Sequence, residues 1–407
     1  SWNNAVDKNI DALNKYFSKY ENRISKIGWV STWSSKCGIA SYSRRFINHM
    51  PDEVYIFSPY NEIQETSQEN INLVNEKKLI PSWTPTSNED QNLDNLFFQI
   101  KVKKITSLVI QFNFGFFNIN QLELFIDKLL VSKINVIIVL HSTILPNSDD
   151  TNYSLVFKNV LKKCTRVLVH TVKDLNRLRN LNLIDNVTLF IHPILDFQSI
   201  DKKLSNKYKM QSRNKKQINL VTYGFCLPPK GFSELIQAIY ILKNKNVSVR
   251  LDIYSAIYSE EFKFVFQGLI DLVNQLELND IVNLHCEFVP EDQLLMTLNK
   301  YDLVVFPYQM SSESSSASVR DGLASLKQVI VTPLPIFDDI YDLVDFFDGT
   351  SPDHIAKGIL EWYERLRTDP RAIMKTHLQR ITKIKSRRFS LLTQKFSLLI
   401  NSLEINQ

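Results

Sequence analysis

Short apolar runs alternate with longer amphipathic stretches along most of the chain. The runs are brief, continuous and rich in β-branched residues, as buried parallel strands are. In the first half they fall at Ile27–Thr32, Val54–Ser58, Leu108–Phe112, Val136–His141, Val167–His170 and Val187–His192. Helical spacing of apolar positions between them marks Ile39–His49, Ile119–Val131, Tyr153–Lys162 and Val172–Leu181. This alternation predicts a doubly wound parallel sheet with helices on both faces.

The alternation stops at 199–217, where Lys, Asn and Ser replace the aliphatic pattern and indicate a linker. A second series of strands is expected at Ile218–Gly224, Val247–Tyr254, Ile281–His285, Leu303–Phe306 and Val329–Thr332. Its helices are expected at Glu234–Leu242, Glu261–Leu276, Glu291–Leu298, Ser316–Leu326 and Pro352–Leu366. Asn3–Tyr20 and the tail also show helical spacing.

The pattern therefore predicts an α/β protein of two Rossmann-like domains. The first is expected over residues 1–200 and the second over 216–369, followed by further helices over 370–407. Ligands of such sheets bind at the carboxyl ends of the strands. With two sheets facing each other, we expect the binding site in the cleft between them.

Composition narrows the classes of protein that remain. Of the 407 residues, 44% are hydrophobic, which excludes disorder for most of the chain and supplies a core for each domain. No apolar run approaches the ~20 residues that span a bilayer. A net charge of +5 does not require a nucleic acid, and none is expected as a partner. The four cysteines lie far apart, which disfavours a zinc site or disulfides and favours the cytoplasm.

The segment 307–324 carries the densest candidate chemistry. Glu313 precedes three serines, Ser314, Ser315 and Ser316, on an expected strand-to-helix turn. Asp321 follows eight positions after Glu313. The free N–H groups at a helix start bind phosphate, and the guanidinium of Arg320 can donate two hydrogen bonds to the same phosphate. Carboxylates suit the hydroxyls of a sugar or ribose. The alternative is a plain serine-rich loop that caps a helix.

Three other strand ends combine a turn with polar residues. Gly38 lies at the first turn of the first domain, where glycine permits close approach of a ligand. His141 ends a buried strand, and Lys230 follows the first strand of the second domain, where a lysine can neutralise a leaving diphosphate. Each also has a purely structural interpretation. Dinucleotide and Walker A fingerprints are absent, no metal site stands out, and the acidic pair Asp338–Asp339 is expected to be exposed.

Taken in order, these segments resemble the retaining family 4 glycosyltransferases of the GT-B fold, especially mannosyltransferase-like members that build bacterial O-antigen and capsule polysaccharides. STWSSKCGIASYSRRF resembles the family's glycine loop, and VIQFNFGFF with VIIVLHST resembles its "hEFGiF … TLH" pair. LVHTVKDLNRL resembles the next strand and helix, and YGFCLPPKGFSELIQAI resembles the "G-R-L-x-P-x-K-G" loop. The segment 306–340 resembles the E-x7-E region. The matches cover most of residues 26–340.

The resemblance implies roles position by position. The catalytic residues would be three: His141 would lie beside the donor sugar, Lys230 would bind the leaving diphosphate, and Glu313 would contact the sugar hydroxyls. Gly38 would approach the diphosphate, and the N–H groups of Ser314, Ser315 and Ser316 would hold the sugar and phosphate. Asp321 would bind the ribose, and Phe288 and Val289 would lie beside the base. The fold would include a last helix that crosses back onto the first domain, within residues 370–407.

Two positions depart from the family pattern. Phe225 stands where the glycine–lysine loop of the family carries an arginine, so one cation for the diphosphate is missing. Arg320 is our candidate for its replacement. Asp321 stands where the family has a glutamate. The predicted activity is transfer of a sugar, with retention and without a metal or cofactor, from a nucleotide-diphosphate donor to a growing glycan or lipid-linked acceptor.

The donor and the setting are less narrowly defined. The mannosyltransferase-like segments favour GDP-mannose, with a UDP-linked sugar as the alternative. Basic stretches at Arg44–Arg45, Lys101–Lys104 and Lys383–Arg388 suggest peripheral docking on the inner face of the membrane. The start at Ser1 is compatible with a piece of a larger multidomain protein. The alternatives are a non-catalytic module that binds a sugar nucleotide or glycan, and another GT-B enzyme such as a nucleotide-sugar epimerase or a phosphorylase.

Overall fold

A computed structural model describes residues 26–35, 37–64, 78–144, 151–197, 217–257 and 260–404. Its first sheet has seven parallel strands in the order β3-β2-β1-β4-β5-β6-β7. They are β1 (Ile27–Val30), β2 (Val54–Pro59), β3 (Leu79–Trp83), β4 (Ser107–Phe112), β5 (Asn135–Leu140), β6 (Arg166–Val169) and β7 (Val187–Leu189). The connecting helices are α2 (Gly38–His49), η1 (Tyr60–Gln64), α3 (Asp94–Lys103), α4 (Ile119–Val131), α5 (Thr151–Lys163) and α6 (Val172–Asn180).

The second sheet has six parallel strands in the order β10-β9-β8-β11-β12-β13. They are β8 (Ile218–Phe225), β9 (Val249–Ala256), β10 (Val282–His285), β11 (Leu303–Phe306), β12 (Gln328–Val331) and β13 (Asp345–Phe346). The helices of this domain are η3 (Pro228–Lys230), α8 (Phe232–Asn244), η4 (Glu260–Phe262), α9 (Lys263–Gln275), α10 (Glu291–Leu298), α11 (Ala317–Ala324), η5 (Pro335–Ile340) and α12 (Pro352–Thr368).

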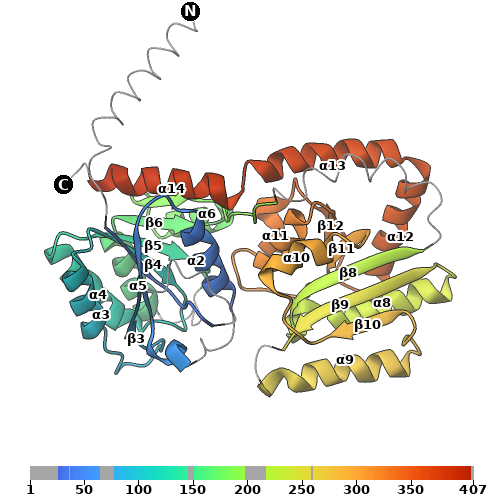
Figure 1. Cartoon of the computed structure of the whole chain (residues 1–407), viewed down its shortest axis with the longest axis horizontal. Helices are drawn as coiled ribbons and strands as arrows, with labels where there is room; N and C mark the ends of the chain where they lie inside the picture. The colour runs from blue at the N-terminus through green and yellow to red at the C-terminus, as the bar shows by residue number, and fades with distance from the viewer. Residues whose placement is uncertain are drawn as a thin grey trace, which may run out of the picture.

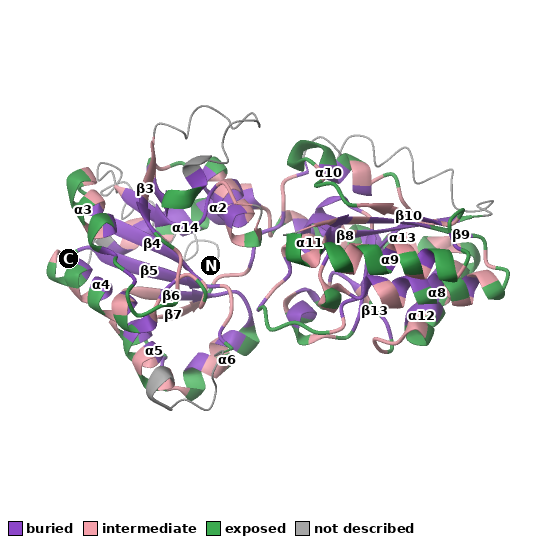
Figure 2. Ribbon diagram, turned by 90° about the horizontal axis from the view of Figure 1, so that it is seen from below, coloured by how far each residue is buried: buried purple, intermediate pink, exposed green. Residues whose placement is uncertain are grey.

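Each sheet is buried on both faces, which explains why its strands read as continuous apolar runs (Figure 2). One face of the first sheet packs against α3, α4 and α5, and the other packs against α2. In the second sheet, α8, α9 and α12 cover one face, while α10 and α11 cover the other. The predicted doubly wound α/β architecture is therefore confirmed.

The C-terminal helices join the two domains (Figure 1). Helix α13 (Pro370–Lys385) lies along the second domain, and α14 (Phe389–Glu404) lies across the first. Phe389, Phe396 and Ile400 of α14 are buried in the same core as α2. The chain crosses from one domain to the other between α13 and α14. There Arg388 forms a parallel β-bridge with Ile194, and Ser390 Oγ donates to Asp196 at 2.5 Å. The predicted return of the last helix to the first domain is confirmed.

Three elements escape the sequence pattern. Strand β3 contains Pro81, which the sheet tolerates because β3 is an edge strand. Helix α3 exposes Phe98 and Val102, so its apolar positions do not define one face. Strand β13 has only two residues. The predicted helix at Asn3–Tyr20 lies outside the described residues, as does nearly all of the predicted linker at 199–217.

Candidate functional site

The carboxyl ends of the two sheets meet at the junction of the domains. His141 directly follows β5, and its carbonyl accepts the backbone N–H of Ser314 from the second domain at 3.2 Å. Next to it, Ser142 Oγ donates to the carbonyl of Ser312 at 3.0 Å. The structure thus brings together two segments that the sequence analysis singled out, although more than 160 residues separate them.

Lys230 belongs to the same junction. Its Nζ donates to the hydroxyl of Tyr308 at 2.9 Å and lies 4.0 Å from the centre of that ring. The Tyr308 hydroxyl lies 3.0 Å from Ser316 Oγ. The pKa of Lys230 is raised: burial opposes the shift, but Tyr308 and Glu313 outweigh it. Tyr308 was not predicted as a site residue; its place next to the serine-rich segment was the available signal.

Gly231 explains why the lysine loop has its shape. Its φ is +72°, and a Cβ there would lie 1.8 Å from the carbonyl oxygen of Pro307. Only glycine fits such a contact, and it also adopts this left-handed backbone at no steric cost. The glycine therefore lets the loop after β8 press against the loop after β11, which carries Tyr308.

The serine-rich segment caps a helix, as its sequence indicates. Ser316 is the N-cap of α11, and its Oγ accepts the N–H of Val319 at 3.4 Å. Glu313 is exposed at the turn, and the charge of Lys230 lies close enough to interact with it. The N–H of Ser314, predicted to hold a ligand, is engaged by His141 in this structure. Two of the three predicted catalytic side chains, Lys230 and Glu313, therefore lie together beside the loop of the third.

Asp321 takes part in an ion-pair clasp between the domains. Arg45 on α2 donates through its terminal nitrogen to Asp321 at 2.7 Å and through Nε to Glu291 at 2.6 Å. Asp321 is 3% exposed, and its pKa is raised because burial outweighs the attraction of Arg45. The predicted ribose ligand is thus covered by an arginine of the other domain. A ribose would have to displace Arg45 to reach it.

Arg320 is not placed as the sequence analysis expected. Arg320 is 1% exposed, and its guanidinium forms an ion pair with Asp339 and donates to the carbonyl of Ser316 at 2.9 Å. Its Nε also faces the carbonyl of His192 in the first domain at 3.4 Å. These contacts leave the guanidinium of Arg320 unavailable to a diphosphate. The expectation that Asp339 is exposed is wrong as well, because its side chain is 5% exposed within this pair.

The loop after β1 contains an anion contact that the sequence analysis missed. The backbone N–H groups of Trp33, Ser34 and Ser35 all donate to the carboxylate of Glu62, over distances of 2.8–3.3 Å. Glu62 is 5% exposed. Successive N–H groups of this kind form an anion-binding nest, and here the chain fills it with its own carboxylate. Gly38, one turn later, begins α2, is exposed, and has open space where a Cβ would lie.

Three histidines gather behind the junction. His141, His170 and His192 follow β5, β6 and β7, and Tyr42 on α2 packs against all three rings at 5.0–5.7 Å between ring centres. Burial lowers the pKa of His141 and of His192 well below 6.5, and it lowers that of His170 to about 4. The rings are therefore neutral at pH 7, and a lowered pH must charge them.

We expect the protein to lose stability between pH 7 and pH 5. An unfolded histidine binds a proton below pH 6.5, whereas folded His170 does so only near pH 4, so acid favours unfolding. For His170 alone the loss at pH 5 is about 2 kcal/mol. Urea unfolding of His170→Phe at both pH values should show a smaller difference than the wild type. His354→Phe, at an exposed position, is the control; equal losses in all three proteins would contradict the prediction.

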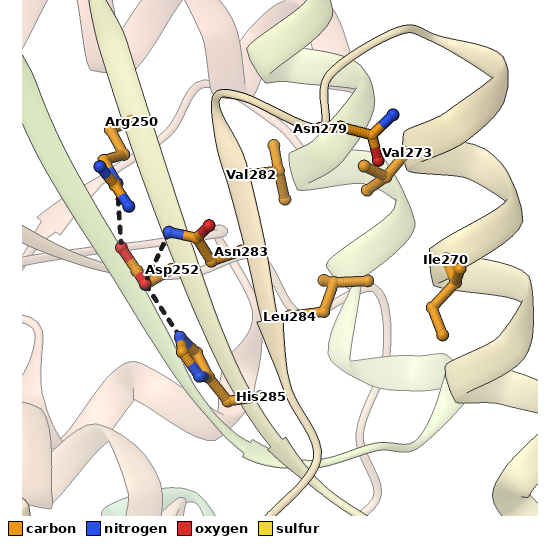
Figure 3. Close-up of a pocket in the computed structure, with 9 residues that line it drawn as sticks. All are labelled: Arg250, Asp252, Ile270, Val273, Asn279, Val282, Asn283, Leu284 and His285. Carbon is orange, nitrogen blue, oxygen red and sulfur yellow. Dashed lines mark hydrogen bonds and ion pairs between the residues drawn. The ribbon is translucent and has the colours of Figure 1, made fainter.

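The remaining predicted residues lie at or after the carboxyl ends of strands in the second sheet. Phe225 ends β8 and is partly buried, and Phe288 and Val289 lie in the loop between β10 and α10. A separate cavity of about 550 Å³ opens at strands β9 and β10 (Figure 3). There Asp252 accepts from Asn283 at 3.0 Å and from His285 at 2.9 Å. None of the predicted site residues lines this cavity.

The basic stretches are mostly engaged within the protein. Arg44 donates to the carbonyl of Trp33, Arg45 forms the clasp, and Lys383 and Arg387 both pair with Asp342. The docking expectation is therefore wrong for Arg45, while Lys101 and Lys104 remain exposed. None of the described helices is both long and apolar enough to cross a membrane. The described residues contain no cluster of side chains suited to a metal ion.

No protein-family model and no curated protein matches the sequence. Solved structures do match it. A glycosyltransferase from Rickettsia africae shares 12% identity at a TM-score of 0.71, over 95% of this chain and 100% of that one. HepE from Anabaena, bound to UDP, shares 11% identity at a TM-score of 0.68, over 93% of this chain and 100% of that one. Sucrose-phosphate synthase from Thermosynechococcus elongatus shares 10% identity at a TM-score of 0.65, over 94% of this chain and 100% of that one. Together with the two facing sheets and the returning helix, this similarity shows that the chain has the GT-B fold of glycosyltransferases.

Proposed function

We propose that this chain is a glycosyltransferase that moves a sugar from a nucleotide-diphosphate donor to a growing glycan, with retention at the anomeric carbon. The observation that carries the proposal is the junction itself. Lys230, Tyr308 and the Glu313 turn of one domain meet the His141 loop of the other at the carboxyl ends of both sheets. In open α/β sheets this is where ligands bind.

The chemistry requires a neutralised leaving group and a dry site rather than a covalent step. Lys230 would neutralise the diphosphate, and Glu313 and His141 would hold hydroxyls of the sugar. Closure of the domains would exclude water, and the contacts between His141 and Ser314 and between Arg45 and Asp321 hold the two domains together in this structure. No step needs a metal in this proposal.

The structural neighbours support a nucleotide sugar as the donor. HepE has been crystallised with UDP-glucose, and one study of trehalose-6-phosphate synthase concerns glycosyl transfer with retention. For this chain, membership of family 4, a GDP-mannose donor and a role in O-antigen or capsule synthesis remain proposals from the sequence resemblance. The same holds for a lipid-linked acceptor, a cytoplasmic location and docking through Lys101–Lys104.

A thermal-shift panel with UDP, GDP, dTDP, CDP and ADP tests the donor site. Each nucleotide is used at about one hundred times a micromolar Kd, where binding should add about 2.7 kcal/mol to the free energy of unfolding. A shift with one nucleotide supports the proposal and identifies the donor base. The candidate acceptors are then offered with the corresponding sugar nucleotides, and the anomeric configuration of the product is read by NMR.

A second candidate function is a non-catalytic module that binds a glycan or sugar nucleotide. The observation that favours it is that two groups predicted to bind the donor are already paired within the protein. Arg45 covers the carboxylate of Asp321, and the carbonyl of His141 accepts the N–H of Ser314. Failure of all five nucleotides to shift the melting temperature, together with a shift caused by a glycan, would support this module.

A further inference from the structure

Gln111 is a buried polar residue that the proposed mechanism does not use. It lies in β4, is 0% exposed, and shares a sheet face with Val109 on the side of α2. Its Oε1 lies 2.8 Å from Nε2 of His141. Burying an amide without a partner costs free energy, so a fully buried glutamine beside a site residue calls for a reason.

This contact determines which nitrogen of His141 carries the proton. An amide oxygen only accepts hydrogen bonds, so the ring nitrogen that faces it must be the N–H. The neighbouring rings have the opposite form: Nδ1 of His170 faces the carbonyl of Phe190 at 2.8 Å, and Nδ1 of His192 faces the carbonyl of Pro193 at 2.9 Å. His141 therefore differs from both histidines that it adjoins.

We propose that Gln111 is a positioning residue that holds His141 in its Nε2–H form, so that Nδ1 accepts a hydrogen bond from a hydroxyl of the bound sugar. This inference rests on the proposed function for its substrate. His141 is partly buried as a residue, and its backbone carbonyl contacts the turn that carries Glu313, so it lies where the two domains meet. The lowered pKa of His141 keeps the ring neutral, which leaves Nδ1 with a free lone pair.

The direction of this hydrogen bond restricts the donor sugar. A hydroxyl donates to Nδ1, whereas a fluorine or an ionised carboxylate at the same place cannot. We therefore expect the site to take a sugar with a free hydroxyl facing His141 and to reject the analogue that carries fluorine there. If His141 instead donated through Nδ1, fluorine would retain part of the interaction.

The tautomer is measurable without any substrate. In protein labelled with ¹⁵N at histidine, long-range ¹H–¹⁵N spectra separate protonated from unprotonated ring nitrogens, and His141→Gln assigns the signals of His141. We expect Nε2 to be protonated in the wild type. Protonation of Nδ1 would overturn the proposal, because it would mean that the Gln111 amide is turned round and donates to the ring. The amide nitrogen has no partner among the described residues, so only this contact orients it.

Two variants test the role of Gln111. Gln111→Met removes the acceptor at similar volume and should abolish the preference for Nε2–H, whereas Gln111→Glu retains an acceptor oxygen and should keep it. Gln328→Met is the matched control, because Gln328 is another glutamine buried in a strand, and it accepts the ring N–H of Trp362. The proposal is overturned if Gln111→Met leaves the tautomer of His141 unchanged.

Transfer rates complete the test. With the donor identified by the nucleotide panel, Gln111→Met should lower kcat/KM by about tenfold, the usual value of one hydrogen bond. Gln328→Met should not lower it. An unchanged kcat/KM in Gln111→Met would overturn the positioning role even where the tautomer is as proposed. If the wild type transfers no sugar, the proposed function fails, and the spectra alone then uphold or overturn the assignment for Gln111.

Discussion

Replacing Asp339 by asparagine is expected to lower the free energy of unfolding by about 3–5 kcal/mol. The substitution leaves the guanidinium of Arg320 as a charge without its ion-pair partner, and the Arg320 side chain is 2% exposed. Arg320 then retains only neutral acceptors, namely the carbonyls of Ser316 and His192 and the amide oxygen of the new asparagine. Urea unfolding measures the loss. Asp338→Asn is the matched control one residue earlier, since Asp338 is exposed and should lose little.

The pair also decides whether Arg320 has a role beyond stability. A double variant, Arg320→Met with Asp339→Leu, removes both charges and should be far more stable than Asp339→Asn, because no buried charge remains unpaired. If the double variant still gives the nucleotide shift of the wild type, Arg320 does not bind the diphosphate. Equal losses for Asp338→Asn and Asp339→Asn would contradict the assignment of the ion pair.

Lys230→Met is expected to reduce kcat about 10²–10³-fold while the protein stays folded. The methionine keeps much of the aliphatic stem over Tyr308 but removes the cation that would neutralise the leaving diphosphate, and one preorganised group of this kind contributes a factor of that size. Initial rates with the identified donor measure the effect. The hydroxyl of Tyr308 still has Ser316 as a partner, so no buried polar group is left alone.

A matched lysine is available on the adjacent helix. Lys243 on α8 donates to the carbonyl of Glu277 at the exposed surface, and Lys243→Met should leave the rate unchanged. A rate for Lys230→Met within a few-fold of the wild type would contradict the proposed role. Loss of the thermal shift with nucleotide in the same variant would show that Lys230 contributes to binding as well as to the reaction.

Much of the architecture follows from the sequence because both sheets are buried on their two faces. Such strands are continuous apolar runs, and their linking helices carry apolar stripes, so the alternation of the two is legible without a structure. The same pattern does not find β3, whose Pro81 belongs to an edge, or α3, which exposes Phe98 and Val102. These elements depend on their neighbours more than on their own periodicity.

The turns that carry candidate chemistry were also identifiable from the sequence. Ser316 has the residue type of an N-cap and serves as one. Gly231 lies in the turn after β8, and α8 begins at the next residue. These are local properties of the backbone, which a few neighbouring residues decide. Sequence alone therefore located the loops that bear His141, Lys230 and Glu313.

The partners of the charged side chains were decided only by the tertiary structure. Arg320 and Asp321 are adjacent in sequence, yet one is paired with Asp339 of its own domain and the other with Arg45 of the opposite domain. Glu62 belongs to no motif, and Gln111 lies in the VIQFNFGFF segment without an assigned role there. Both gain their significance from groups about 30 residues away. Ion pairs and hydrogen bonds depend on distances between elements, which periodicity does not encode. The pattern of apolar and polar residues thus determined the fold and the positions of the loops. The packing of the two domains determined which charged side chains are paired within the protein.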